Sequence, residues 1–157
     1  MRVGIGYDIH QFAEGRRLIL GGVEIPSEKG LIGHSDADVL SHAIADAILG
    51  AAGLGDIGYY FPNNDPSIEG ISSLEILRKA VSLAGENDWC LENVDASLIM
   101  EAPKIAPYVE AMKKCIAEAL GVSVRNVGIK ATTNETLGAI GRGEGVAAMA
   151  VALLKDK

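Results

Sequence analysis

The sequence predicts an α+β fold: a mixed β-sheet with helices packed on one side, plus a small hairpin. Strand-like segments, in which apolar residues alternate with small or polar ones, occur near both ends and in the middle of the chain. Segments with helical spacing lie between them, and a glycine pair divides one short apolar stretch. Because no repeat, linker or low-complexity stretch interrupts the sequence, we expect a single domain over residues 1–157.

The first half of the chain contains a predicted strand, hairpin and helix. Apolar residues alternate with small or polar ones over residues 3–10, which predicts a strand. Residues 18–26 are predicted to form a hairpin that turns at Gly21-Gly22. A helix is predicted over residues 36–51, with Ser35 as its N-cap.

The second half begins with a loop rich in glycine, asparagine, aspartate and proline at residues 53–66. Capping residues, a proline and glycines then mark two helices, and alternating apolar residues mark three strands. The helices are predicted over residues 72–85 and 107–121, and the strands over 94–100, 127–132 and 145–154.

The composition argues against several kinds of partner. The formal net charge is −7 and the 14 lysines and arginines are scattered, which argues against a nucleic-acid partner. No apolar run reaches the ~18 residues of a membrane span, so we expect no membrane partner.

Cys90 and Cys115 have no CxxC partner and are expected to be reduced thiols of a cytoplasmic protein, or of a plastid stromal one if a transit peptide has been removed. Hydrophobic residues make up 48% of the chain and aromatic residues only 4%, and this aliphatic excess favours an oligomer.

Asp8, His10 and His42 are the candidate metal ligands. Asp8 and His10 are two residues apart on the predicted strand, so their side chains leave the same face, ~6 to 7 Å apart along the chain. The other residues of that face, Gly4 and Gly6, are expected to leave room for a ligand. Two imidazoles and one carboxylate suit Zn²⁺ and leave a fourth coordination position open for a substrate.

His42 lies in a polar stripe of the predicted first helix. Asp38, His42 and Asp46 are spaced four residues apart, so they share one helix face. Either aspartate could accept the free ring N–H of His42 and fix its tautomer. Taken singly, Asp8 and His10 could be a surface pair and His42 a hydrogen-bonded core histidine, but the combination favours a metal site.

Six short motifs occur in order along the chain and carry a resemblance to a known family. They are Gly-Tyr-Asp-Ile-His at 6–10, Gly-His-Ser-Asp-Ala-Asp at 33–38, Leu-Gly-Asp-Ile-Gly at 54–58, Ala-Pro-Lys at 102–104, Lys-Ala-Thr-Thr-Asn-Glu at 130–135 and Gly-Arg-Gly-Glu-Gly at 141–145. From residue 1 to about residue 154 the chain resembles the 2-C-methyl-D-erythritol 2,4-cyclodiphosphate synthase family. The resemblance implies a lyase of non-mevalonate isoprenoid biosynthesis. Such an enzyme converts 4-diphosphocytidyl-2-C-methyl-D-erythritol 2-phosphate to the 2,4-cyclodiphosphate and releases CMP.

The resemblance also implies roles for individual residues. Asp8, His10 and His42 are implied as zinc ligands, and Glu135 as the ligand of a second divalent cation, Mg²⁺ or Mn²⁺, that contacts the substrate phosphates. His34 and Thr133 are the implied catalytic residues. The implied substrate-binding residues are Asp8, Ile9, His10, His34, Ser35, Asp56, Ile57, Gly58, Phe61, Pro62, Asn63, Asn64, Asp65, Met100, Glu101, Ala102, Pro103, Lys104, Ile105, Ala106, Thr132, Thr133, Asn134, Glu135, Ala139 and Arg142.

The resemblance further implies a homotrimer whose active sites lie between neighbouring subunits. It places Ala139 and Arg142 near a central cavity of that trimer. Two positions depart from the family: Asn63 replaces a common aspartate and can only form hydrogen bonds, and Ala139 replaces a residue that is often aromatic. From the residues alone, Arg142 and Glu144 could instead form a turn with a surface ion pair.

Two other functions stay open. A zinc-dependent phosphatase would use the same three ligands to activate water and would release inorganic phosphate. A non-catalytic trimeric metabolite-binding module would retain ligand binding after His42→Ala.

Overall fold

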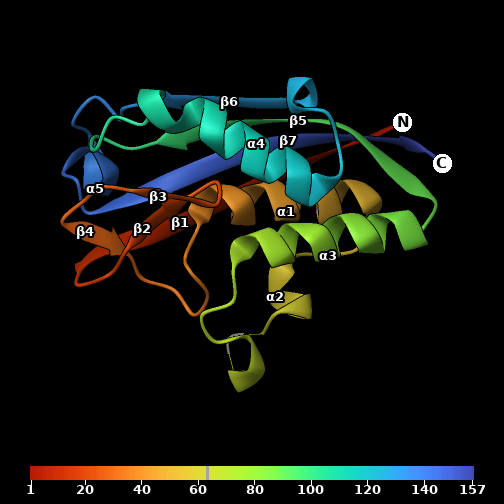
Figure 1. Ribbon diagram of the computed structural model, residues 1–157, viewed down its shortest axis with the longest axis horizontal. Coiled ribbons are helices and arrows are strands. Elements are labelled where there is room, and N and C mark those ends of the chain that lie inside the picture. Colours follow the sequence, from red (N-terminus) through yellow and green to blue (C-terminus); the bar gives the residue numbers. More distant parts are fainter. Residues whose placement is uncertain (63) are drawn as a thin grey trace.

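The computed structural model describes residues 1–62 and 64–157, and its centre is a five-stranded sheet in the order β4-β1-β7-β5-β6 (Figure 1). Three of the four strand pairs are antiparallel, and β5 and β6 are parallel. A separate two-stranded hairpin pairs β2 with β3. The strands are β1 (Arg2–Glu14), β2 (Leu18–Leu20), β3 (Val23–Ile25), β4 (Lys29–Leu31), β5 (Trp89–Ile99), β6 (Val127–Thr132) and β7 (Gly145–Asp156).

The helices cover one face of this sheet (Figure 1). Helix α1 packs across β1 and β7, α3 packs beside α1 and against β5, and α4 packs beside α3 and against β6. This arrangement confirms the predicted α+β class with a mixed sheet, a hairpin and helices on one side. The helices are α1 (Val39–Ala52), α2 (Ile57–Tyr60), α3 (Ser73–Glu86), α4 (Val109–Leu120) and α5 (Gly138–Gly141), with 3-10 turns at Pro66–Ile68, Ala106–Tyr108 and Val124–Asn126.

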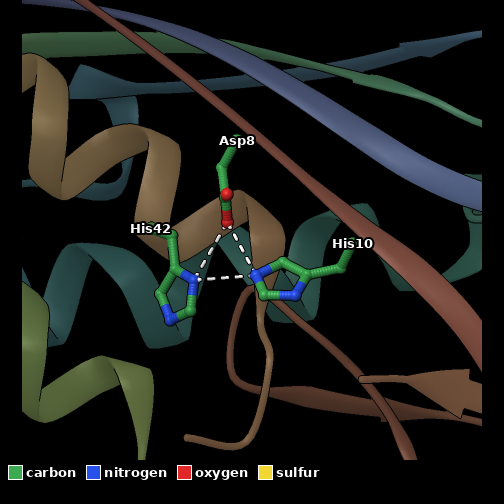
Figure 2. A group of neighbouring side chains, drawn as sticks. All are labelled: Asp8, His10 and His42. Atoms are coloured by element: carbon green, nitrogen blue, oxygen red, sulfur yellow. Dashed lines mark hydrogen bonds and ion pairs between the residues drawn. The ribbon is translucent and has the colours of Figure 1, made fainter. Parts of the chain in front are cut away.

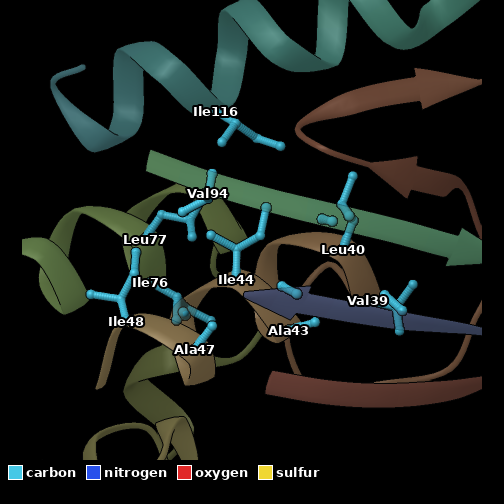
Figure 3. Packing of buried hydrophobic residues seen from close by; sticks show 14 of the residues in the cluster. Val39, Leu40, Ala43, Ile44, Ala47, Ile48, Ile76, Leu77, Val94 and Ile116 are labelled. Atoms are coloured by element: carbon cyan, nitrogen blue, oxygen red, sulfur yellow. The ribbon is translucent and has the colours of Figure 1, made fainter. Parts of the chain in front are cut away.

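The core lies between the sheet and the helices. Ile44 and Ile48 of α1 meet Leu77 of α3, Val94 of β5 and Ile116 of α4, all of them buried (Figure 3). Burying an aliphatic side chain of this size contributes ~1.5 to 3 kcal/mol. Helix α1 is buried on nearly all sides, so its position relative to the sheet is fixed by packing on several elements at once.

Gly4 and Gly6 let α1 lie directly on β1. A β-carbon at Gly4 would overlap the backbone of Ala47, and one at Gly6 would overlap the carbonyl oxygen of Ala43. The expectation that these glycines leave room for a ligand is therefore wrong: the space belongs to the helix. The two glycines still contribute to the site, because the close contact that they allow between helix and strand brings His42 near Asp8.

The first helix begins later than predicted. It starts at Val39 and its N-cap is Asp38, whose side chain accepts a hydrogen bond from the backbone N–H of Ser41. Ser35 is not the cap, because Ala37 has a φ of 58°, outside the range of a right-handed helix. The Ser35 hydroxyl instead accepts the backbone N–H of Ala37 within this turn.

Other differences concern element ends and short elements. Strands β1, β5 and β7 extend beyond the predicted ranges, and Pro107 lies in a 3-10 turn that precedes α4. The predicted loop at 53–66 contains α2. The short elements β4 and α5 were not predicted, since three or four residues give no measurable periodicity.

The sheet face away from the helices is apolar and exposed. On β1 the side chains of Val3, Ile5 and Tyr7 are 69%, 66% and 55% exposed, and on the paired β7 those of Met149 and Val151 are 45% and 44% exposed. Among the described residues, no helix is both long and apolar enough to cross a membrane.

Candidate metal centre and substrate site

Asp8, His10 and His42 converge at one point (Figure 2). The Asp8 Oδ2 atom lies 2.9 Å from His10 Nε2 and 3.0 Å from His42 Nδ1. The two ring nitrogens are 3.3 Å apart. Asp8 and His10 come from one face of β1, and His42 from the first turn of α1. The predicted convergence of a strand and a helix is confirmed.

The hydrogen bonds of the two rings direct their lone pairs toward the shared point. A carbonyl only accepts hydrogen bonds, so His10 Nδ1, 2.5 Å from the Ile32 carbonyl oxygen, carries the hydrogen and Nε2 faces Asp8 unprotonated in the neutral ring. His42 Nε2 lies 2.9 Å from Ser73 Oγ and 3.1 Å from Ser35 Oγ, on the side away from Asp8. Such contacts from outside the ligand set are typical of histidines that bind metals.

The partners predicted for His42, Asp38 or Asp46, are wrong. Asp38 is fully buried, and its carboxylate accepts the backbone N–H groups of Gly21 and Gly22 at 2.9 and 2.7 Å. It therefore ties the β2–β3 turn to the start of α1. Asp46 accepts the backbone N–H of Ile57 at 2.8 Å and holds the start of α2.

The electrostatics of the cluster favour an ionised carboxylate. Burial opposes ionisation of Asp8, but the hydrogen bonds and charges of His10 and His42 outweigh it and hold the pKa of Asp8 well below its ordinary value. Burial likewise lowers the pKa of His10, but the Asp8 carboxylate and the Ile32 carbonyl outweigh it and raise that pKa above 6.5. The Asp8 carboxylate is therefore ionised, as a metal ligand must be.

The ligand atoms fit a tetrahedral divalent ion. In a tetrahedral site with bonds of about 2.0 to 2.2 Å, ligand atoms lie roughly 3.3 to 3.6 Å apart. The three separations here are 2.9, 3.0 and 3.3 Å, so small outward shifts would complete three corners. Two nitrogens and one carboxylate oxygen are ligands that Zn²⁺ accepts, and a fourth corner would remain for a substrate oxygen.

A cavity of about 230 Å³ opens next to the three ligands. Its walls include four of the other predicted substrate-binding regions: His34, Ser35, the Ile57-Gly58 pair and Phe61. They also include three isoleucines that were not predicted, Ile68, Ile71 and Ile76, because isolated aliphatic residues carry no sequence signal for a binding site.

Asp56, Pro62, Asn64 and Asp65 were also predicted to bind substrate, but they are not among the residues that line this cavity. His34 donates its Nε2–H to the Asp65 carbonyl oxygen at 3.0 Å, and the Asp65 side chain accepts from Ser67. Asp56 is exposed and caps α2 by accepting the Tyr59 N–H at 3.2 Å. Pro62 and Asn64 are exposed, while Asn63 lies outside the described residues.

A second group of predicted residues surrounds another cavity, of about 420 Å³. The loop after β5 and the end of β6 form its walls. The lining includes Met100, Glu101, Pro103, Lys104, Ile105, Ala106, Thr132 and Thr133. Ala102 instead lines a neighbouring hollow with Phe12 and Gly143.

The two groups are far apart within one chain. The strand register aligns Ile9 with Ala147, Ala147 with Ile99 and Ile99 with Thr132. Three strand spacings of about 4.8 Å separate Ile9 from Thr132, or roughly 14 Å. The cavities share no lining residue. The Ile9 side chain is 49% exposed, on the sheet face opposite Asp8 and His10.

The segment after β6 is exposed and internally hydrogen-bonded. Thr133 Oγ1 donates to Glu135 Oε1 at 3.2 Å, and Glu101 Oε1 accepts the backbone N–H of Asn134 at 2.8 Å. The Glu135 carboxylate faces solvent beside Thr133.

Ala139 and Arg142 belong to a third region. Ala139 lines a hollow with Ile9, His10 and Glu144. Arg142 Nε donates to Glu144 Oε1 at 2.5 Å, as expected for the surface ion pair that the residues alone allowed. The neighbouring carboxylate raises the pKa of Arg142 above its ordinary value.

Comparison with known sequences identifies many similar proteins. The chain matches the YgbB family over residues 1–155. It is 65% identical to the 2-C-methyl-D-erythritol 2,4-cyclodiphosphate synthase of Akkermansia muciniphila, over 96% of this chain and 90% of that protein. It is 55% identical to the synthase of Chlorobaculum tepidum, over 99% of each.

Solved structures share the fold. The bifunctional IspDF of Campylobacter jejuni matches with a TM-score of 0.95 and 42% identity, over 99% of this chain and 42% of that longer chain. The IspF of Plasmodium falciparum, in a CDP complex, matches with a TM-score of 0.86 and 36% identity, over 99% and 96% of the two chains. A CDP-bound 2C-methyl-D-erythritol-2,4-cyclodiphosphate synthase matches with a TM-score of 0.90 and 38% identity, over 98% and 100%.

Proposed function

This chain belongs to the YgbB family, and on that premise we propose that it converts 4-diphosphocytidyl-2-C-methyl-D-erythritol 2-phosphate to 2-C-methyl-D-erythritol 2,4-cyclodiphosphate and releases CMP. Its relatives in this family are named as cyclodiphosphate synthases. The observation that carries the proposal is the convergence of Asp8, His10 and His42 beside a cavity that His34 and Ser35 line.

The reaction is an intramolecular phosphoryl transfer. An oxygen of the 2-phosphate forms a bond to the β-phosphorus, and the bond from that phosphorus to the CMP oxygen breaks with its electron pair leaving on CMP. Such a step needs alignment and neutralisation of charge more than covalent participation by the protein. A zinc ion held by Asp8, His10 and His42 would act as a Lewis acid toward a phosphate oxygen.

His34 and Ser35 would hold a phosphate in the first cavity. The Ser35 hydroxyl accepts the Ala37 N–H. Ser73 donates its hydroxyl hydrogen to Asp36 and so accepts from His42 Nε2, which leaves the Ser35 hydrogen available to a phosphate oxygen. The Nε2–H of His34 is already donated to Asp65, so His34 would contact phosphate through Nδ1 in its protonated form.

The second cavity would hold the cytidine. Two of the similar structures are complexes with CDP, and the walls of this cavity combine apolar residues with Lys104 and Lys130. Thr133 would contact the phosphates and stabilise the transition state. Glu135 would hold Mg²⁺ or Mn²⁺, because a single carboxylate combined with phosphate oxygens suits these oxygen-binding cations.

The complete site would form between subunits of a homotrimer. Within one chain, roughly 14 Å separates the strand that carries the metal ligands from Thr132, and a neighbouring copy would supply the second group at closer range. The exposed apolar face of β1 and β7 gives each copy a surface to bury: Val3, Ile5, Tyr7, Met149 and Val151. A patch of adjacent large apolar side chains is unusual on a monomer.

Phosphorus NMR of the zinc-loaded protein with its substrate tests the function. We expect CMP and the cyclic diphosphate in equal amounts and no inorganic phosphate. Release of inorganic phosphate would instead support a phosphatase. A protein that produces neither, and whose His42→Ala variant still binds CDP as tightly as the unmodified protein, would be a binding module.

A further inference from the structure

A chain of hydrogen bonds leads from His42 to a carboxylate on the far side of the ring. Ser73, the first residue of α3, places its hydroxyl 2.9 Å from His42 Nε2. The same hydroxyl donates to Asp36 Oδ1, and the Ser73 backbone N–H donates to Asp36 Oδ2 at 3.0 Å. His42 and Ser73 are buried, and Asp36 is half-buried.

The direction of these bonds fixes the position of the hydrogen on His42. A serine hydroxyl has one hydrogen, and Ser73 uses it toward Asp36 because a carboxylate can only accept. Ser73 must therefore accept a hydrogen from His42 Nε2. In the neutral ring this leaves a lone pair on Nδ1, which is the atom that faces Asp8 and His10.

Backbone hydrogen bonds fix the positions of Asp36 and Ser73 relative to each other. The Asp36 N–H donates to the Ile71 carbonyl oxygen at 3.1 Å, and the Gly70 N–H donates to the His34 carbonyl oxygen at 2.9 Å. These bonds connect the segment before α1 to the segment before α3. Asp36 and Ser73 are thus kept in register by contacts that do not involve the metal ligands.

We infer that Asp36 and Ser73 are a positioning pair that selects the metal-binding tautomer of His42 and increases the electron density on its Nδ1. The Asp36 charge polarises the Ser73 hydroxyl, which accepts more strongly from Nε2–H, and the ring becomes a better ligand. This inference rests on the proposed zinc site. It assigns a function to two residues that the sequence marks only as lying at the starts of two predicted helices.

Ser73→Ala and Asp36→Asn test the pair, with Ser72→Ala as a matched control. Ser72 is the N-cap of α3 and accepts the Leu74 N–H at 3.3 Å, so its removal weakens the same helix start without touching His42. Zinc affinity is measured by chelator competition, and thermal unfolding of each variant is measured in parallel. We expect Ser73→Ala to weaken zinc binding roughly 10- to 100-fold, as is typical when a partner of a metal-bound histidine is lost. Asp36→Asn should also weaken zinc binding, and Ser72→Ala should leave the zinc affinity unchanged.

Ser73→Thr distinguishes the effect of the hydroxyl on zinc binding from the effect of side-chain packing on stability. Ser73 is fully buried, so the added methyl group should lower the unfolding temperature while the retained hydroxyl keeps zinc affinity. Nitrogen-15 NMR of the zinc-loaded protein should show a protonated His42 Nε2 that exchanges slowly with water, and faster in Ser73→Ala.

Unchanged zinc affinity in Ser73→Ala, or an equal loss in Ser72→Ala, would overturn the inference and leave the metal site intact. An unmodified protein that binds no zinc would overturn the metal site and the inference together, so the two failures are distinguishable.

Discussion

Gly6 of β1 lies directly against the carbonyl oxygen of Ala43 in α1, with no side chain between strand and helix. The metal ligands flank this contact: Asp8 follows Gly6 by two residues, and His42 immediately precedes Ala43. The closeness of backbone to backbone therefore sets the separation of the carboxylate and the imidazole.

Gly6→Ala should damage both stability and metal binding. The new methyl group would overlap the Ala43 carbonyl, and overpacking typically costs ~1 to 3 kcal/mol of unfolding free energy. Moving α1 away would also separate His42 from Asp8. Denaturant unfolding and zinc content check this, with Gly85→Ala as the control: no atom lies within 4 Å of a β-carbon there, so this helical substitution should be neutral or stabilising by ~0.5 to 1 kcal/mol. A Gly6→Ala protein with full stability and zinc content would refute the role given to this contact.

His10→Ala should remove most bound zinc and turnover while the fold is retained. The ligand belongs to a packed scaffold whose core is formed by other residues. Metal analysis and circular dichroism check this. The comparison variant is His34→Ala, which lines the cavity but is not one of the three ligands; it should lose turnover and keep zinc. Unfolding of His10→Ala under conditions where the unmodified protein is stable would identify a structural metal instead.

Zinc binding should weaken as the pH falls. Burial lowers the pKa of His10, but the Asp8 carboxylate and the Ile32 carbonyl outweigh it and raise the pKa above 6.5. Below the raised pKa, zinc must displace a proton from His10, whereas above it this competition disappears. Calorimetry in buffers of different ionisation enthalpy should detect proton release near neutral pH that declines as the pH rises. Binding without proton release at about pH 6 would contradict the assignment of His10 as a ligand.

Ile5→Asp should dissociate the proposed trimer. Ile5 is 66% exposed in one chain and lies in the middle of the apolar face, so assembly would bury an unpaired carboxylate. Sedimentation velocity measures the outcome. Lys79→Asp introduces the same group on an exposed position of α3 and should remain trimeric. If Ile5→Asp sediments like the unmodified protein, this face is not the interface.

The chemistry of the site was more predictable than its supporting contacts. Asp8 and His10 are two residues apart on a strand with clear alternation, so their common face followed from the sequence. The partner of His42 did not, because Ser73 is 31 residues away and reaches the ring only through tertiary packing. Local spacing favoured Asp38 and Asp46, which are committed to backbone N–H groups elsewhere.

Backbone geometry accounts for the remaining error at this end of α1. Serine is a residue type common at N-caps, but Ala37 has a left-handed backbone conformation, so the helix begins only at Val39. A positive φ at an alanine is rare, and the residue type does not predict it. The displacement matters for function, because it frees the Ser35 hydroxyl to face His42 and the cavity.

Anomalous X-ray scattering at the zinc absorption edge, on crystals of the zinc-loaded protein, tests the central claim most directly. We expect one strong peak per chain, about 2.0 to 2.2 Å from Asp8 Oδ2, His10 Nε2 and His42 Nδ1, with a fourth position open toward the cavity. A peak that lies away from these three atoms, or an ion that only some of them bind, would contradict the proposed zinc site.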